Sequence, residues 1–203
     1  MGQESGNEAV TGTHGVHNFG WGDSLTVDSA VFGEYGSLAA SCDAYNLYSQ
    51  AMAEGLQGGD LIVGHIGAGK EWPDLKKRTQ QVPQNLQINW VGAMSNSDVI
   101  RYYQTEPIDI FINVSSSEGL PVSIMEAISF DIPVLATNVG GTSEIVTQES
   151  GMLIDADVTP EILATKIIEL YKQRKNFHPR QFWQTHFSAA KNYPAFIKNI
   201  LLG

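Results

Sequence analysis

The fold is decided by residues 108–137, which read IDIFINVSSSEGLPVSIMEAISFDIPVLAT. The stretch opens with Ile108 to Val114, a nearly continuous apolar run of strand length. A polar loop then leads through Pro121 into a segment whose apolar residues follow helical spacing. Pro133 to Thr137 is a second short apolar run. Strand, helix and strand in this order predict a βαβ unit with parallel strands.

The same alternation extends in both directions along the chain. Further strands are expected at Leu25 to Tyr35, Leu61 to His65, Leu86 to Val91 and Met152 to Ile154. Further helices are expected at Ser41 to Leu56, Trp72 to Gln80, Asp98 to Gln104 (with Asn96 or Ser97 as its cap), Thr142 to Thr147, Thr159 to about Gln173 (Thr159 as cap, Pro160 in first position), Arg180 to His186 and Ala189 to Leu202. Central strands that are apolar on both faces indicate a parallel sheet covered by helices on both sides. The predicted fold is therefore α/β with a doubly wound parallel sheet, in which ligands bind beyond the carboxyl ends of the strands.

The composition describes an acidic chain of one-domain size. The chain has 203 residues, and 42% of them are hydrophobic, which is enough for one ordinary core. Its net charge of −10 argues against nucleic acid or an anionic membrane as the main partner. The charge is uneven, because residues 1–69 contain eight acids and no Lys or Arg, whereas the other 134 residues hold 14 acids and all 12 bases.

The chain is expected to be cytoplasmic. Met1 to Gly20 is polar and Gly-rich, with neither a basic start nor an apolar core, so it does not read as a signal peptide. The longest apolar runs are too short to form a transmembrane segment. Cys42 is the single cysteine and has no internal partner for a disulfide, which favours a reducing location.

The loop after Val114 and the helix that follows it concentrate the chemistry. Gly119 lets the backbone approach a ligand closely, and Pro121 fixes the start of the helix. The free N–H groups of the first turn and the helix dipole form an anion site that suits a diphosphate. Glu118 and Glu126 flank this site, and Glu126 lies in a largely buried helix where a carboxylate needs a partner. Carboxylates accept hydrogen bonds from hydroxyls, so the pair suits a hydroxyl-rich ligand.

These residues carry a family resemblance. Residues 118–126 read EGLPVSIME, and two glutamates separated by seven residues resemble the signature of retaining GT-B glycosyltransferases, above all glycosyltransferase family 4. The resemblance extends to AISFDIPV at 127–134, TNVGGTSEIV at 137–146, Gly151 to Leu153, HIGAG at 65–69 and NWVG at 89–92. It covers roughly residues 60–175.

The resemblance implies a role for each matching residue. Glu118, the catalytic candidate, would contact hydroxyls of the donor sugar, and Glu126 would bind the ribose hydroxyls of the nucleotide. Gly119 and Leu120 would offer backbone N–H groups to the sugar or the diphosphate. The remaining donor-binding candidates are Pro121, Gly67, Val91 and Gly92, the last two near the base. Members of the family usually need no catalytic metal or other cofactor and use UDP-, GDP- or ADP-sugars as donors.

The resemblance also implies an incomplete enzyme. Members of the family hold the donor diphosphate with an Arg and a Lys just before the helix expected at Ser41 to Leu56, but this chain has no basic residue before Lys70. A leaving diphosphate needs positive charge to stabilise it. Family enzymes also bind the acceptor through an N-terminal Rossmann-like domain. An N-terminal acceptor domain or a partner subunit is therefore expected to complete the site.

The expected organisation is one half of a GT-B fold. Residues 1–24 are expected to form a disordered lead, residues 25–178 the Rossmann-like nucleotide-sugar-binding domain, and residues 179–203 C-terminal helices that pack on it. The aromatic residues of these last helices fit packing better than a carbohydrate platform; they are Phe182, Trp183, Phe187, Tyr193 and Phe196. The family resemblance implies that the last helix crosses towards the other domain, so some of these aromatics are expected to be exposed here.

Other interpretations stay open. The chain fits a non-catalytic nucleotide-sugar-binding module, one subunit of a two-chain enzyme, or a structural remnant that binds nothing. The run GHIGAGK at 64–70 has P-loop spacing, but Glu71 follows where a P-loop has Ser or Thr.

Smaller features also have two interpretations each. His14 and His17 have no further metal ligands near them in the sequence, so no metal site is expected. His65 fits a core histidine better than a contact to the donor. Gly140-Gly141 fits a turn better than a close approach to the donor.

Overall fold

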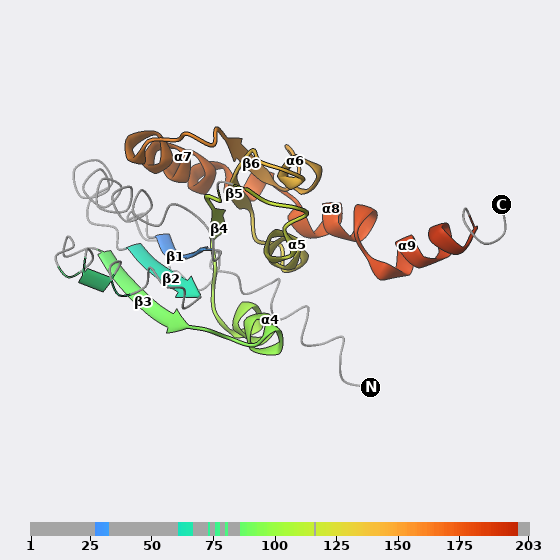
Figure 1. The fold of residues 1–203 in the computed structure, drawn as a ribbon, viewed down its shortest axis with the longest axis horizontal. Helices are drawn as coiled ribbons and strands as arrows, with labels where there is room; N and C mark the ends of the chain where they lie inside the picture. Colours follow the sequence, from blue (N-terminus) through green and yellow to red (C-terminus); the bar gives the residue numbers. More distant parts are fainter. Residues whose placement is uncertain are drawn as a thin grey trace.

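The computed structural model describes residues 27–32, 61–66, 73, 76, 77, 80, 86–115 and 117–198 (Figure 1). Several expectations lie outside these ranges: the lead 1–24, the helix at Ser41 to Leu56, residues 67–69 of the run HIGAG (Gly67 among them), and Lys70. The helix expected at Trp72 to Gln80 is described at only four of its positions.

The described strands form one sheet in which every pairing is parallel. Its strands are β1 (Val27–Phe32), β2 (Leu61–Ile66), β3 (Leu86–Gly92), β4 (Ile110–Asn113), β5 (Val134–Thr137) and β6 (Gly151–Ile154). Their order in the sheet is β3-β2-β1-β4-β5-β6. The chain therefore winds outward from β1 to β3 and then returns to continue on the other side of β1. This order confirms the predicted doubly wound sheet and places its topological switch point between β1 and β4.

Helices cover both faces of this sheet (Figure 1). They are α4 (Asn96–Thr105), α5 (Val122–Ser129), α6 (Thr142–Ile145), α7 (Pro160–Gln173), the short 3-10 helix η1 (Arg174–Asn176), α8 (Pro179–His186) and α9 (Ala189–Phe196). On one face, α7 packs on β4 through Ile110 and Ile112, which are buried with Leu163 and Ile167. On the other face, Phe111 is buried with residues of α4, α5 and α8. The alternation of β4 side chains between the two clusters explains why its sequence is apolar without interruption up to Ile112.

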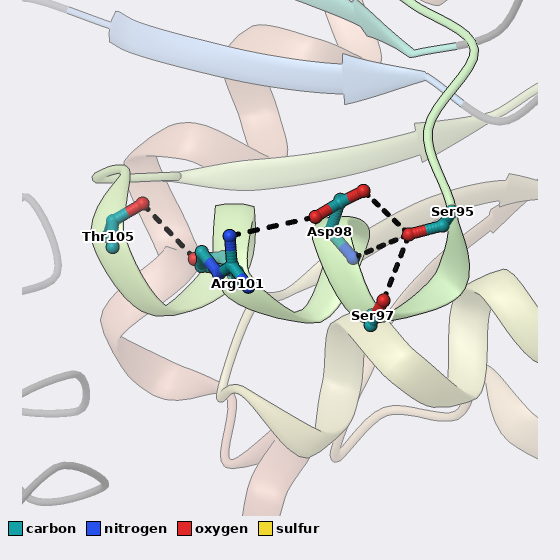
Figure 2. A network of polar contacts seen from close by, with 5 residues as sticks. All are labelled: Ser95, Ser97, Asp98, Arg101 and Thr105. Atoms are coloured by element: carbon teal, nitrogen blue, oxygen red, sulfur yellow. Dashed lines mark hydrogen bonds and ion pairs between the residues drawn. The ribbon is translucent and has the colours of Figure 1, made fainter.

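The helix starts show where local sequence predicts well and where it does not. Thr159 caps α7 through the N–H of Ile162, and Pro160 occupies the first turn, as predicted. The cap of α4 was predicted wrongly, because it is Ser95 rather than Asn96 or Ser97. Ser95 Oγ accepts a hydrogen bond from the Asp98 N–H at 3.2 Å and bonds to the Asp98 carboxylate at 2.6 Å (Figure 2). Figure 2 also shows the Ser97 hydroxyl joining this network 2.9 Å from Ser95 Oγ.

The last helices differ in how they pack. Phe182 of α8 is buried in the cluster that contains Ile124 and Ile128 of α5. By contrast, α9 has no buried residue, and its Tyr193 and Phe196 are exposed. Figure 1 shows α9 extending away from the sheet. Among the described residues, no helix combines the length and the apolar character needed to cross a bilayer.

Candidate functional site

Glu118 lies in the loop that follows β4, at the carboxyl edge of the sheet beside the switch point. Its Oε1 accepts a hydrogen bond from Nδ2 of Asn113 at 3.1 Å. Asn113 is only 3% exposed, and its Oδ1 accepts a hydrogen bond from the backbone N–H of Ser115 at 3.1 Å. Because the oxygen faces a donor and the nitrogen faces a carboxylate, the orientation of the amide is defined. The Glu118 carboxylate is thereby tied to the end of the strand.

Glu126 lies in the middle of α5 and is half-buried. Its Oε1 accepts a hydrogen bond from Nδ2 of Asn96, the first residue of α4. Burial raises the pKa of the Glu126 carboxyl above its ordinary value, and the hydrogen bond from Asn96 opposes this rise. Among the described residues, the partner of this carboxylate is therefore a neutral amide, which does not cancel its charge and leaves it available to a ligand.

The first turn of α5 presents backbone donors for which the described part of the chain supplies no hydrogen-bond partner. Pro121 is buried as its N-cap residue, and the helix has no side-chain cap. The first intrahelical bond of this turn runs from the N–H of Met125 to the carbonyl of Pro121 at 3.3 Å, so the three preceding N–H groups have no helical partner. These donors and the helix dipole favour an anion. Leu120 and Val122, which are 47% and 59% exposed, add apolar surface beside them.

Gly140 and Gly141 support the loop that carries Glu118. Gly140 has a φ of +52°, and a Cβ at this position would lie 1.8 Å from the carbonyl oxygen of Glu118. Gly141 donates its N–H to the carbonyl of Gly119 at 2.8 Å, and a Cβ there would lie 2.7 Å from the same oxygen. The pair therefore makes a turn, as favoured from the sequence, and also a close backbone approach that no side chain would permit. The sequence interpretation missed this second role.

Val91 and Gly92 end β3 and are both half-buried. Gly92 has a φ of +93°, a conformation in which glycine is strongly preferred. From Gly92 the chain reaches Ser95, the cap of α4, and then Asn96. The end of β3 thus leads directly to the residue that contacts Glu126. Gly67, the remaining predicted contact, lies outside the described residues.

His65 has the surroundings of a core residue. It lies near the end of β2, is 7% exposed, and its ring packs edge-on against Trp90 of β3 at 5.1 Å between centroids. Burial lowers the pKa of His65, which favours the neutral ring. These contacts support the interpretation of His65 as a packed histidine.

Further polar groups surround the loop. Two buried hydroxyls, Ser115 Oγ and Thr142 Oγ1, have no hydrogen-bond partner among the described residues. Ser115 begins the loop that carries Glu118, and Thr142 follows the glycine pair that supports this loop. Both hydroxyls are therefore further hydrogen-bonding groups beside the loop. Within the described ranges, no group of three or more His, Cys, Asp or Glu side chains is placed to hold a metal ion.

The structure therefore joins two groups of predicted residues. Glu118, Gly119, Leu120, Pro121 and Glu126 lie on one loop and helix, and Val91 and Gly92 lead to the contact with that helix.

Sequence reasoning missed the two asparagines that hold the carboxylates. Asn113 gave a usable signal, because it is a polar residue in an apolar run. Asn96 gave none, since a residue of its type at a helix start is ordinarily a cap.

The chain matches a known family over most of its length. The family described as "Glycosyl transferases group 1" matches residues 45–182. The O-antigen biosynthesis glycosyltransferase WbnH of Escherichia coli is 28% identical over 138 residues, which are 68% of this chain and 38% of that protein. The chain thus spans less than half the length of this relative.

Solved structures share the fold at low sequence identity. The lipopolysaccharide outer core galactosyltransferase WaaB aligns with a TM-score of 0.66 at 14% identity, over 88% of this chain and 50% of that chain. Anabaena HepE, solved in complex with UDP-glucose, aligns with a TM-score of 0.62 at 14% identity, over 88% of this chain and 49% of that chain. The described fold therefore corresponds to about half of each of these proteins.

Proposed function

The chain belongs to the glycosyl transferases of group 1, and we propose that it is the part of such an enzyme that binds a nucleotide-diphosphate sugar as the glycosyl donor. One observation carries the proposal: the loop after β4 and the helix α5 present two carboxylates, each held by an asparagine amide, together with a helix N-terminus that has no side-chain cap. The open N–H groups suit a diphosphate, and the carboxylates suit hydroxyl groups. The complex of HepE with UDP-glucose supports a nucleotide sugar as the class of ligand.

In this proposal each site residue takes a distinct part of the donor. Glu118 accepts hydrogen bonds from hydroxyls of the sugar, and Glu126 accepts them from the ribose. Backbone N–H groups of Gly119 and Leu120, with those of the first turn of α5, face the diphosphate or the sugar. The remaining donor contacts are Pro121 at the start of the helix, Gly67, and Val91 and Gly92 beside the base.

We assign the reaction to the retaining class, as in glycosyltransferase family 4, on the strength of the two glutamates separated by seven residues. The acceptor hydroxyl would attack the anomeric carbon from the face on which the diphosphate leaves. The bond from the anomeric carbon to the phosphate oxygen breaks, and the leaving phosphate oxygen takes the proton of the acceptor. The N–H groups at the N-terminus of α5 would stabilise the negative charge that develops on the leaving diphosphate.

The acceptor would bind to another part of the enzyme. The matched region is only 38% of WbnH and about half of WaaB, so each of these relatives has a large part that this chain does not cover. We propose that an N-terminal acceptor domain or a partner subunit supplies the acceptor site. The name of the E. coli relative supports a role in building a surface polysaccharide.

A second candidate is a non-catalytic nucleotide-sugar-binding module. The observation that favours it is the lack of any Lys or Arg in residues 1–69. Each lost charge-assisted contact to the diphosphate would cost about 1.5–3 kcal/mol. A module tolerates this loss better than an enzyme, because only an enzyme has to stabilise the departing diphosphate.

Calorimetric titration tests the donor site. The purified chain is titrated with UDP, GDP and ADP, and with UDP-glucose, GDP-mannose and ADP-glucose. We expect micromolar binding of one nucleotide and its sugar conjugate, and a loss of roughly tenfold or more in Glu126→Ala, since a hydrogen bond to a charged group contributes about 1.5–3 kcal/mol. Glu149→Ala is the matched control, because Glu149 is an exposed acid in the turn before β6, at the opposite edge of the sheet.

Two outcomes of the titration are decisive. Absence of binding at millimolar concentration for all six compounds would show that the chain is not a donor-binding part. Where binding is found, turnover in the presence of the acceptor-binding part separates the candidates, because part of an enzyme then transfers the sugar, whereas a module leaves the nucleotide sugar intact in any company.

A further inference from the structure

Two asparagines from different elements each hold one carboxylate of the proposed donor site. Asn113 ends β4 and donates to Glu118, while Asn96 begins α4 and donates to Glu126. We infer that these asparagines are positioning residues, with Asn113 orienting Glu118 for the sugar and Asn96 orienting Glu126 for the nucleoside. The inference rests on the proposed function and deepens it, because it divides the recognition of the donor between two separate pairs.

Asn113 is a buried polar residue in an apolar strand, and both ends of its amide are hydrogen-bonded. The other three residues of β4 are apolar and buried, and Asn113 itself is 3% exposed. A buried amide destabilises the fold unless both of its ends are hydrogen-bonded, whereas an apolar side chain of similar size carries no such requirement. Both ends of this amide are engaged, the nitrogen by Glu118 and the oxygen by the N–H of Ser115.

A purely structural role explains only half of these contacts. The bond from the Ser115 N–H to Asn113 Oδ1 spans two residues and forms an Asx-type turn that anchors the loop. An aspartate would anchor the loop equally well through the same oxygen. It would, however, remove the donor that faces Glu118 and place a second negative charge there. The nitrogen of Asn113 is therefore the part of the side chain that the loop itself does not require.

Asn96 reaches Glu126 from an anchored helix end. The cap of α4 fixes the backbone just before Asn96, because Ser95 Oγ bonds to the N–H and the carboxylate of Asp98 (Figure 2). Asn96 is exposed, so its own amide would be solvated without any protein partner. The contact therefore matters mainly for Glu126, because it holds the half-buried carboxylate in one orientation. The two residues are 30 positions apart in the sequence.

The two pairs make different predictions, because only one of them faces the sugar. Asn113→Asp is expected to remove most of the affinity that a nucleotide sugar gains over its nucleotide, while the affinity for the nucleotide alone changes by less than about twofold. Asn96→Ala is expected to lower the affinity for the nucleotide and for the nucleotide sugar by the same factor, because it removes the hydrogen bond that orients Glu126. The expected factor is roughly three- to tenfold, and tenfold corresponds to about 1.4 kcal/mol. Each variant thus serves as the matched control for the other.

The experiment titrates the full chain with UDP and UDP-glucose, or with whichever of the GDP/GDP-mannose and ADP/ADP-glucose pairs the wild type binds. A double-mutant cycle adds Glu118→Ala with and without Asn113→Asp. If Asn113 acts through Glu118, Asn113→Asp has no further effect on the affinity for the nucleotide sugar once Glu118 is absent. Glu118→Ala changes a half-exposed loop residue. If a buried aspartate unfolds the chain, Asn113→Ser takes its place in the cycle, because serine keeps a side-chain oxygen for the Ser115 N–H but removes the amide that faces Glu118. Thermal unfolding of every variant confirms that it is folded.

The outcomes separate this inference from the proposed function. Failure of the wild type to bind any of the ligand pairs would overturn the proposed function and the donor roles with it. Binding by the wild type, combined with equal losses for nucleotide and nucleotide sugar in Asn113→Asp, would overturn the inference alone. A further loss from Asn113→Asp in the Glu118→Ala background would do the same, because Asn113 would then act on something other than Glu118.

Discussion

Because Gly140 has no side chain, its backbone can pack closely against the loop that carries Glu118. A Cβ at Gly140 would lie 1.8 Å from the Glu118 carbonyl oxygen, and the residue has a φ of +52°. We expect Gly140→Ala to lower the free energy of unfolding by about 2–5 kcal/mol, since a left-handed conformation costs about 1–2 and overpacking about 1–3. Urea denaturation measures this loss. Binding of the donor should weaken as well, because Glu118 moves with its loop.

Gly119 provides the matched control for Gly140. Apart from Gly119 itself and its two chain neighbours, no heavy atom of the described residues lies within 4 Å of the Cβ that a side chain at Gly119 would add. Gly119→Ala should therefore change the free energy of unfolding by less than about 1 kcal/mol. If the two substitutions cost the same, the close approach at Gly140 is not what holds the loop.

The start of α4 is the element on which the contact to Glu126 depends. Ser95 accepts a hydrogen bond from the Asp98 N–H, which satisfies one of the helix's unpaired donors. We expect Ser95→Ala to lower the free energy of unfolding by about 1 kcal/mol, as is usual for a lost N-cap. The same substitution should weaken nucleotide binding, because Asn96 begins the turn that the cap fixes. Chemical denaturation and calorimetry provide the two measurements.

Ser97 is the control for this cap. Its hydroxyl joins the same network through Ser95 Oγ but does not cap the helix (Figure 2). Ser97→Ala should stay within about 0.5 kcal/mol of the wild type, as surface substitutions usually do. A cost equal to that of Ser95→Ala would mean that the network as a whole, rather than the cap bond, stabilises the start of α4.

The elements of the sheet were predictable because burial leaves a local signal. The residues of β4 and β5 are all buried, so their apolar runs marked them in the sequence to within about two residues. The cap of α4 was not predictable, because Ser95, Asn96 and Ser97 are all types that cap helices. The chain path from Gly92, which leaves Ser95 in an extended conformation, selects among them.

The candidate site was predictable only where its residues are neighbours in the sequence. Residues 118–121 and Glu126 belong to one loop and helix, so spacing and helix chemistry placed them together. Asn96 meets Glu126 across 30 residues, and Gly140 meets Glu118 through the packing of two loops. No periodic pattern in the sequence predicts either contact, because each depends on how parallel strands bring separate loops to one edge of the sheet.

The charge of the whole molecule acts on any diphosphate that approaches it. The chain carries a net charge of −10, and its first 69 residues contain no Lys or Arg. At low ionic strength the protein should therefore repel a nucleoside diphosphate, and salt should weaken this repulsion. The backbone N–H groups of α5 act at contact distance, where salt screens little. The two effects predict that added salt strengthens nucleotide binding.

The direction in which salt changes the affinity distinguishes a diphosphate site made of backbone N–H groups from one made of Lys or Arg side chains. We expect the affinity for the nucleoside diphosphate that the wild type binds to rise roughly two- to threefold between about 20 and 200 mM KCl, as the Debye length falls from about 20 to below 10 Å. The matching uncharged nucleoside is the control, and its affinity should not change. A clamp of Lys or Arg side chains predicts the opposite, because salt screens attraction as it screens repulsion. Calorimetry over a salt series decides between them, and an affinity that falls with salt would show that basic residues from later in the chain, such as Lys70, hold the diphosphate after all.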